Sequence, residues 1–235
     1  MIQYMKLHRF IGAYNLAQDE VKIEKEDVVK QIRNVLRLEN DEKIILCDGQ
    51  GEEAIAEITE LAKNFIKAKI LERKKTGSEP ERRVTLYLAI LKKENFELAV
   101  QKAIECGVSR IVPIITERTI KTGLNKERLE KIIMEASEQS GRGIVPELDS
   151  IMDLKKAMKE SKAEEKILFD LSGDSYKTNT KASSIIIFIG PEGGFTENEI
   201  FFAKENKFTI SSLGTLTLRA ETAAIVTTYR SVLGI

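Results

Sequence analysis

The chain has 235 residues, of which 42% are hydrophobic and 31% charged, a composition typical of folded globular domains rather than disordered chains. Its 37 basic and 37 acidic residues cancel, so any contact with RNA has to rest on local patches rather than on net charge. No apolar run approaches the roughly 20 residues of a membrane span, and the first ten residues lack a signal-peptide core. Cys47 and Cys106 lie far apart without metal-ligand spacing. We therefore expect reduced thiols in a cytoplasmic protein, with no membrane partner and no metal.

The first part of the chain predicts a small domain rich in strands. Apolar runs typical of strands occupy residues 8–14, 42–49, 52–61 and 65–73, and CDGQGEE suits a hairpin turn. Residues 27–38 repeat apolar side chains at helical spacing, with Asp27 as a possible N-cap. A compact β-barrel with one short helix, over residues 1–73, fits this pattern.

The segment RKKTGSEPERR, residues 73–83, joins turn formers to a run of charge. It predicts a linker over 74–83 and a second domain over 84–235. In that domain we expect helices over 94–107, 125–138, 151–161, from 197, and from 221 to 234. We expect strands over 84–91, 110–116, 166–171, 184–189 and 208–213. Alternation of helices with unbroken apolar strands predicts an α/β fold, in which a parallel sheet has helices on both faces.

Three local signals mark the ends of the helices in this domain. Gly107 suits the position just past the C-terminus of the helix over 94–107. Ser150 with Asp153 predicts a capping box for the helix over 151–161. Thr196 with Glu199 predicts a capping box for the helix that begins at 197, and Phe195 with Ile200 suits a hydrophobic staple there.

The stretch SIIIFIGPEGGFTENEI, residues 184–200, places a glycine loop between a buried strand and this last helix. In open parallel sheets ligands bind at the carboxyl ends of strands, and glycines allow a ligand to approach closely. A phosphate site is disfavoured, because no Lys-Ser/Thr follows the glycines and Glu192 is negative. The loop better suits a neutral or positively charged ligand. A tight strand-to-helix turn that needs glycine for its geometry alone explains it equally well.

Two further segments place charged side chains next to glycine. SSLGTLTLRAETAAIV, residues 211–226, sets Arg219 and Glu221 at the start of an apolar helix, where a first-turn acid is also favoured by the helix dipole alone. ASEQSGRGIVPEL, residues 136–148, sets Glu138 and Arg142 around a helix end, which C-cap chemistry also explains.

Together GPEGGFTENE, LGTLTLRAETAA and ASEQSGRGIVPE resemble the RsmE family of 16S ribosomal RNA uridine-N3 methyltransferases, members of the SPOUT superfamily. The likeness continues through HRF at 8–10, NVLRL at 34–38, LCDG at 46–49 and the segment 92–113. Family members usually carry Arg-Ile where this chain has Leu216 and Thr217. Ahead of the VLR triplet, a His is common in the family, and this chain has Gln31 there. The first departure puts in doubt a contact made by the missing arginine.

The resemblance implies a PUA-like RNA-binding β-barrel followed by a SPOUT α/β domain tied in a trefoil knot. It also implies a homodimer with the active site at the dimer interface, and S-adenosylmethionine as methyl donor. The expected substrate is a uridine in helix 44, in the decoding region of the small ribosomal subunit, methylated at N3 in the 16S rRNA.

The resemblance further implies roles for individual residues. Arg219 is expected to stabilise charge on the uracil, and Glu221 or Glu138 to handle the proton or orient the arginine. The residues expected to bind the cofactor are Leu168, Ile189, Gly190, Glu192, Gly194, Leu213, Gly214, Leu218 and Thr222. Those expected to bind RNA are Arg9, Arg33, Arg37, Arg82, Arg83 and Arg142, with Arg73, Lys74 and Lys75 near the linker. A solvated run of charge is the simpler reading of the basic residues.

Other functions remain open at this point. Another SPOUT reaction, such as ribose 2′-O-methylation, would give a different modified nucleoside. An RNA-binding assembly factor that has lost catalysis would bind no S-adenosylmethionine, or bind it without transfer. A nucleotide hydrolase is disfavoured by the absent P-loop lysine.

Overall fold

The computed structural model describes residues 7–120 and 122–235, and the chain divides into two compact units. One unit comprises Met1–Glu79 with Ser137–Val145, and the other Pro80–Ala136 with Pro146–Ile235. The division after Glu79 lies inside the segment expected to be a linker. The segment Ser137–Val145, in contrast, groups with the N-terminal unit although it lies far from it in sequence. Each unit is described by itself below.

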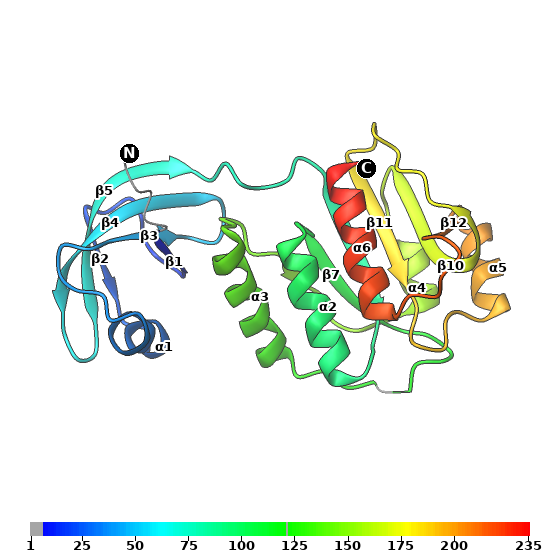
Figure 1. Cartoon of the computed structure of the whole chain (residues 1–235), viewed down its shortest axis with the longest axis horizontal. Coiled ribbons are helices and arrows are strands. Elements are labelled where there is room, and N and C mark those ends of the chain that lie inside the picture. The colour runs from blue at the N-terminus through cyan, green and yellow to red at the C-terminus, as the bar shows by residue number, and fades with distance from the viewer. Residues whose placement is uncertain (1–6, 121) are drawn as a thin grey trace. The chain divides into compact units, whose positions relative to one another are not determined.

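The N-terminal unit is built on a five-stranded sheet with the order β1-β3-β4-β5-β2 (Figure 1). The first pair is parallel and the others are antiparallel. Side chains alternate along the strands, so that Ile44 and Leu46 of β3 and Ile58 of β4 share one buried core with the short helical segment. The strands are β1 (His8–Ile11), β2 (Glu20–Ile23), β3 (Lys43–Cys47), β4 (Glu52–Leu61) and β5 (Ile66–Lys75).

Two features of this unit differ from the sequence prediction. The helix expected over 27–38 consists of α1 (Glu26–Lys30) followed by a π-helical turn, Gln31–Val35. Asp27 as N-cap is wrong: the cap position is Lys25, which makes no side-chain cap hydrogen bond, and Asp27 lies in the first turn. Strand β2 was not anticipated, because it has four residues at the sheet edge and alternates Val21 and Ile23 with charged residues.

The C-terminal unit contains a seven-stranded sheet in the order β12-β10-β11-β6-β7-β8, with β9 also paired to β7. Every pair is parallel, which confirms the predicted sheet. Strand β11 lies inside the sheet and is covered on both faces, which explains its unbroken apolar run. The strands are β6 (Arg83–Ala89), β7 (Arg110–Ile115), β8 (Glu147–Leu148), β9 (Met152–Asp153), β10 (Glu165–Ser175), β11 (Ser184–Ile189) and β12 (Thr209–Ser212).

Helices cover both faces of this sheet, as expected. α6 (Ala220–Leu233) packs on β6 and β11 and lies beside α2 (Lys93–Glu105) (Figure 1). On the other face α4 (Leu154–Glu160) and α5 (Glu197–Glu205) share a core with alternate side chains of the strands, among them Tyr87 and Phe188, whose rings stack 4.3 Å apart. The remaining helix is α3 (Lys126–Ser140), whose last four residues group with the N-terminal unit. Within the described residues no helix is both long and apolar enough to cross a membrane.

Two of the three predicted helix ends agree with the structure. Gly107 follows the C-cap of α2 with φ +95°, and Thr196 and Glu199 form a capping box at α5. The capping box of Ser150 with Asp153 is wrong: α4 begins at Leu154, and Asp153 is itself the N-cap, accepting from the Lys156 N–H at 3.1 Å. The reason is that residues 152–153 pair with β7 as strand β9 and so cannot start a helix.

Candidate functional site

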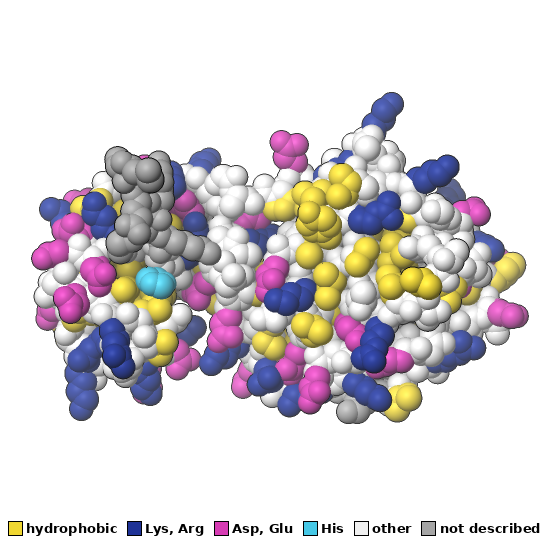
Figure 2. All heavy atoms as spheres, in the orientation of Figure 1, with side chains coloured by type: hydrophobic (Ala, Val, Ile, Leu, Met, Phe, Trp, Pro, Cys, Tyr) yellow, Lys and Arg dark blue, Asp and Glu magenta, His cyan; other side chains and the backbone are white. Residues whose placement is uncertain are grey.

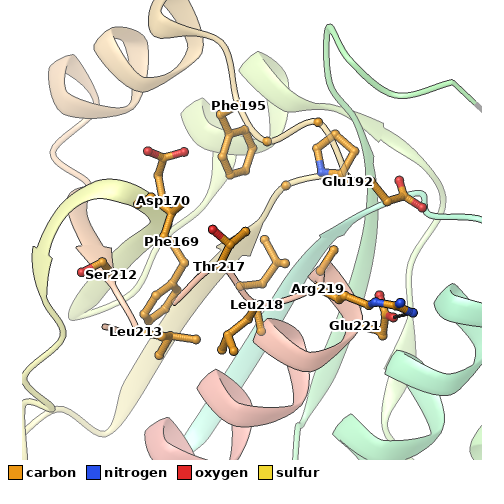
Figure 3. A pocket seen from close by; sticks show the side chains of 18 of the residues that line it. Phe169, Asp170, Glu192, Phe195, Ser212, Leu213, Thr217, Leu218, Arg219 and Glu221 are labelled. Atoms are coloured by element: carbon orange, nitrogen blue, oxygen red, sulfur yellow. Dashed lines mark ion pairs between the residues drawn. The ribbon is translucent and has the colours of Figure 1, made fainter. Parts of the chain in front are cut away.

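A cavity of about 860 Å³ lies in the C-terminal unit at the carboxyl ends of β10, β11 and β12 (Figure 3). This is the edge of a parallel sheet at which ligands bind. Its walls are the part of β10 around Phe169, where the pairing with β11 ends, the glycine loop after β11, and the segment between β12 and α6. The side chains labelled in Figure 3 are Phe169, Asp170, Glu192, Phe195, Ser212, Leu213, Thr217, Leu218, Arg219 and Glu221.

The glycine loop forms one wall and is shaped by its backbone. The Gly194 N–H donates to Pro191 O at 2.8 Å, closing a tight turn in which Gly194 adopts φ +68°. A Cβ on Gly190 would lie 3.1 Å from the Phe195 ring, tighter than ordinary packing allows. The turn geometry therefore accounts for part of the glycine pattern, while the loop also lines the cavity.

Arg118 and Glu199 hold this loop. The bond of Glu199 to the Thr196 N–H is the predicted capping box, but sequence reasoning missed the contacts of both side chains with distant segments. Arg118, from the segment after β7, donates through Nη1 to Gly193 O at 2.7 Å and to Phe195 O at 3.3 Å. The buried Glu199 accepts from the Thr196 N–H and, through its other oxygen, from the Glu117 N–H, each at 2.8 Å. No local pattern reports contacts between residues about 75 to 82 positions apart, so the sequence offered no signal for them.

Replacing Thr196 with alanine removes the oxygen that accepts from the Glu199 N–H at 3.3 Å. We expect the free energy of unfolding to fall by about 1 kcal/mol, the usual effect of losing an N-cap. Urea denaturation of Thr196→Ala measures this, with Thr196→Ser as the control that keeps the oxygen. Equal stability of the alanine variant and the wild type would contradict the role of the cap.

Glu192 has a structural partner that the sequence did not indicate. Its exposed carboxylate accepts from the Lys92 N–H at 3.2 Å, where α2 begins. Lys92 is the N-cap of that helix and provides no side-chain cap, so the negative charge compensates the helix dipole at this end. Glu192 thus links the glycine loop to α2 and also lines the cavity.

The opposite wall is the segment between β12 and α6. Gly214 has φ +123°, a conformation that favours glycine. Within the described part of the chain, no hydrogen bond engages the backbone N–H groups of residues 213–218. Leu213 and Leu218 lie near Phe169 in Figure 3 and make an apolar side to this wall. The wall therefore offers both an apolar surface and free backbone polar groups.

Arg219 and Glu221 lie together at the other end of the cavity in Figure 3. The Arg219 side chain is 85% exposed, and its Nη1 is 4.0 Å from Glu221 Oε1. The Glu221 side chain is only 8% exposed, and its Oε2 is buried with no hydrogen-bond partner among the described residues. A buried carboxylate oxygen without a partner is costly, so this end of the cavity favours a ligand that brings a donor or a positive charge.

The structure brings most residues of the expected cofactor site into this cavity. Those in its lining are Ile189, Gly190, Glu192, Gly194, Leu213 and Leu218, beside Arg219 and Glu221. Leu168 is fully buried in the core on the α4 and α5 face, and its neighbour Phe169 lines the cavity instead. The reason is the alternation of side chains along β10. Gly214 and the exposed Thr222 are outside the lining.

Glu138 and Arg142 belong to the N-terminal unit and have structural partners there. Glu138 Oε1 accepts from the Ile11 N–H at 2.7 Å, which ties β1 to the end of α3. Arg142 is buried and pairs with Glu79 at 2.8 Å. Glu79 also accepts from the Gly143 and Ile144 N–H groups, each at 3.0 Å. Burial of its guanidinium within this unit does not favour RNA binding by Arg142, which stays a prediction.

Several of the arginines expected to bind RNA form ion pairs or hydrogen bonds with other residues of the protein. Arg9 pairs with the buried Glu53 at 2.6 Å and donates to Cys47 Sγ at 2.8 Å. Burial acts to lower the pKa of the Arg9 guanidinium. The hydrogen bond and charge of Glu53, together with Cys47, outweigh burial, so this pKa is raised. Burial raises the pKa of the Cys47 thiol to about 11, even though Arg9 acts to lower it.

The other basic residues divide into bonded and exposed ones. Arg33 donates to Ala62 O at 2.9 Å, and Arg82 donates to Ser231 O and Asn179 O in the C-terminal unit. The Arg73 guanidinium donates to the carbonyl groups of residues 16–18 and to Asp19 Oδ1. Lys74 pairs with Glu53 at 3.3 Å. Arg37, Lys75 and Arg83 are exposed and remain able to contact a polyanion.

Among the described residues, no group of three or more His, Cys, Asp or Glu side chains could hold a metal ion. The cavity instead combines an apolar wall, free backbone polar groups and one unsatisfied carboxylate oxygen. That combination suits an organic ligand with a flat ring and a positive centre better than a phosphate.

Comparison with known families and proteins gives matches along most of the chain. Residues 78–230 match an RNA methyltransferase domain, and residues 25–71 match an RNA methyltransferase PUA domain. The ribosomal RNA small subunit methyltransferase E of Rickettsia conorii is 32% identical over 233 residues, which cover 94% of this chain and 93% of that protein. The protein of the same name from Aquifex aeolicus is 32% identical over 209 residues, covering 86% and 89%.

Solved structures resemble the chain along nearly its whole length, including two that contain a bound cofactor. One is the ribosomal RNA small subunit methyltransferase E of Neisseria gonorrhoeae bound to S-adenosyl methionine, with a TM-score of 0.88 and 32% identity, covering 94% of this chain and 95% of that one. The other is a methyltransferase of Legionella pneumophila in complex with the same cofactor, with a TM-score of 0.86 and 30% identity over 95% and 96%.

Proposed function

This chain belongs to the ribosomal RNA small subunit methyltransferase E family, and from that premise we propose that it transfers a methyl group from S-adenosylmethionine to N3 of a uridine in 16S rRNA. The proposed site is a uridine of helix 44, in the decoding region of the small ribosomal subunit. The N-terminal unit, which matches a PUA domain, is proposed to bind the RNA.

The observation that carries this proposal is a cavity with an apolar wall that is also lined by Glu221, whose buried Oε2 has no hydrogen-bond partner among the described residues. Phe169, Leu213 and Leu218 would hold the adenine ring of the donor by apolar contact. The free backbone groups of residues 213–218 would satisfy its polar edge. When bound, S-adenosylmethionine supplies an electrophilic methyl carbon on a positively charged sulfur, and the carboxylates of this cavity are compatible with that charge.

The acceptor nitrogen sets the chemical difficulty. Uracil N3 carries a proton whose pKa lies about two to three units above neutrality, so ionising it costs roughly 3–4 kcal/mol at pH 7. We assign removal of this proton to Glu221 and stabilisation of the negative charge on the uracil oxygens to Arg219. The exposed guanidinium of Arg219 is free to meet the base.

Glu138 was the other candidate for handling the proton. Its carboxylate already accepts from the Ile11 N–H within the N-terminal unit. Losing that bond would leave the Ile11 N–H of β1 without this acceptor. We therefore propose Glu221 for this role and a structural role for Glu138.

The proposal is tested with small ribosomal subunits that lack the modification. They are incubated with the protein and labelled S-adenosylmethionine, and the RNA is digested to nucleosides and analysed by mass spectrometry. We expect label in 3-methyluridine. Label in a 2′-O-methylated nucleoside would instead identify a different SPOUT reaction. Cofactor binding without any transfer would support an assembly factor that has lost catalysis, and naked RNA in parallel shows whether the assembled subunit is needed.

We also propose that the protein acts in the cytoplasm and that its C-terminal domain is knotted around the cofactor site.

We further propose that the chain forms a homodimer. Figure 2 shows hydrophobic side chains gathered over the region of α6, where Tyr229 and Leu233 are 49% and 53% exposed. An apolar patch of this kind suits contact with another protein surface. Sedimentation equilibrium is expected to give twice the chain mass of 26.5 kDa. A single-chain mass at micromolar concentration would refute the dimer.

A further inference from the structure

A second cavity, of about 530 Å³, adjoins the candidate site within the C-terminal unit. The two cavities share four lining residues, Arg118, Asp170, Ser172 and Phe195. The remaining lining of the second cavity comes from α5, through Glu197, Ile200, Phe201 and Lys204. The second cavity is therefore a lateral extension of the candidate site along α5.

Phe201 is the unusual residue of this cavity. Its neighbours Ile200, Phe202 and Ala203 belong to the core between α5 and the sheet, but Phe201 is 63% exposed and packs in neither hydrophobic core. An exposed phenyl ring on the wall of a cavity offers a flat face for stacking. Bases of single-stranded nucleic acid stack on such rings, whatever their identity.

Two basic side chains, Lys204 and Arg118, line the second cavity together with Phe201. Lys204 follows Phe201 by three positions, so both lie on the same side of α5, and the lysine is exposed without an ion pair among the described residues. Arg118 is exposed as well. Its Nη1 donates to the glycine loop, and its other N–H groups remain available among the described residues. These two side chains suit a phosphate at the rim of the cavity.

Hydrogen-bond acceptors complete the lining. Asp170 uses Oδ1 to accept from Ser172 N and Oγ, at 2.9 and 2.7 Å, and Glu197 is exposed in the first turn of α5. Carboxylates can accept from the N–H groups of a base edge but would repel a purely anionic ligand. A nucleotide carries all three features, namely a ring face, N–H donors and a phosphate.

We propose that the second cavity binds a nucleotide adjacent to the methylated uridine, with its base stacked on Phe201 and its phosphate contacted by Lys204 and Arg118. The inference rests on the proposed function, since the first cavity must hold the methyl donor and the target base for a neighbouring nucleotide to reach the second. It gives α5 a role in selecting the RNA segment, in addition to covering the sheet.

The test compares Phe201→Ala with Phe201→Trp, which keeps a stacking face. One readout is the affinity for unmethylated small subunits, measured by filter binding, together with kcat/KM for their methylation. The other is the affinity for S-adenosylmethionine alone, measured by calorimetry. We expect Phe201→Ala to weaken subunit binding roughly 5- to 150-fold, the range of losing one base stack, with cofactor affinity unchanged. Phe201→Trp should stay within about threefold of the wild type in both.

A second pair of variants tests the phosphate contact. Lys204→Ala should reduce the slope of log affinity against log salt by about one, whereas Lys162→Ala, an exposed lysine outside both cavities, should leave it unchanged. Ile151→Ala, which removes an exposed apolar residue outside both cavities, is the control for Phe201.

Two outcomes would overturn the inference. Subunit affinity of Phe201→Ala equal to that of the wild type would remove the stacking role. Loss of cofactor affinity in that variant would assign the second cavity to the methyl donor instead. Failure of the proposed function is distinguishable from both, because it appears as the absence of 3-methyluridine with the wild-type protein itself.

Discussion

Replacing Arg219 with alanine is expected to lower turnover at least about 100-fold, while the affinity for S-adenosylmethionine stays near that of the wild type. The loss corresponds to removing one charge-stabilising donor from the transition state, typically about 2.7–4 kcal/mol. The Arg219 side chain is 85% exposed and its Nη1 lies 4.0 Å from Glu221 Oε1, so little of the fold depends on it. Single-turnover methylation of small subunits measures the first quantity, and calorimetry the second.

Arg219→Lys is the matched variant, since it keeps the positive charge but loses the planar pair of donors. We expect it to recover only part of the turnover, because an ammonium cannot donate two parallel hydrogen bonds to neighbouring oxygens. Turnover of Arg219→Ala close to that of the wild type would end the assignment. A large loss of cofactor affinity would show that Arg219 acts in binding the donor rather than in stabilising charge on the uracil.

The loop between β11 and α5 could be predicted because its signals are local. A buried strand in the middle of a parallel sheet has an apolar run, and the capping box of Thr196 with Glu199 spans four residues of sequence. The side of the sheet on which a ligand binds follows from strand direction alone. These three facts were sufficient to locate one wall of the cavity, and the motif around Arg219 located the other.

Contacts between distant segments could not be predicted in the same way. Arg118 holds Gly193 O, and Glu192 meets the Lys92 N–H across 100 positions. Neither contact leaves a periodic or capping signal. The second cavity was missed for the same reason, because Phe201 lies within an apolar stretch, EIFFA, in which an exposed ring cannot be told from a core residue.

Charge in a sequence is also a poor guide to exposure. Arg9 and Arg142 are only 13% and 6% exposed, each paired with a glutamate. Buried guanidinium groups require such partners, since an unpaired charge in the interior is strongly destabilising. Basic residues that suggest an RNA path from their sequence positions thus include several that hold the N-terminal unit together.

Replacing Gly173 with alanine is expected to destabilise the protein by about 1–3 kcal/mol, the usual range for overpacking, and to weaken S-adenosylmethionine binding at least about tenfold. A Cβ at this position would lie 2.5 Å from Ile210 C and from Ser211 N. These are backbone atoms of β12, so no side chain can rotate away to relieve the contact. Gly173 lies within a register shift in β10, between Phe169 and Asp174, which both pair with Ser211.

The second effect follows from the position of this contact at the floor of the cavity. Phe169 and Ser172 of β10 and Ser211 of β12 line the cavity, so forcing β12 away from β10 moves both sides of the proposed adenine site. Gly77→Ala is the control, because a Cβ there meets nothing within 4 Å. It should leave both urea stability and cofactor affinity nearly unchanged. The opposite outcome is a Gly173→Ala variant that matches this control in both measurements. In that case β10 and β12 would not be as closely paired at the cavity as described, and the proposed donor site between them would be contradicted.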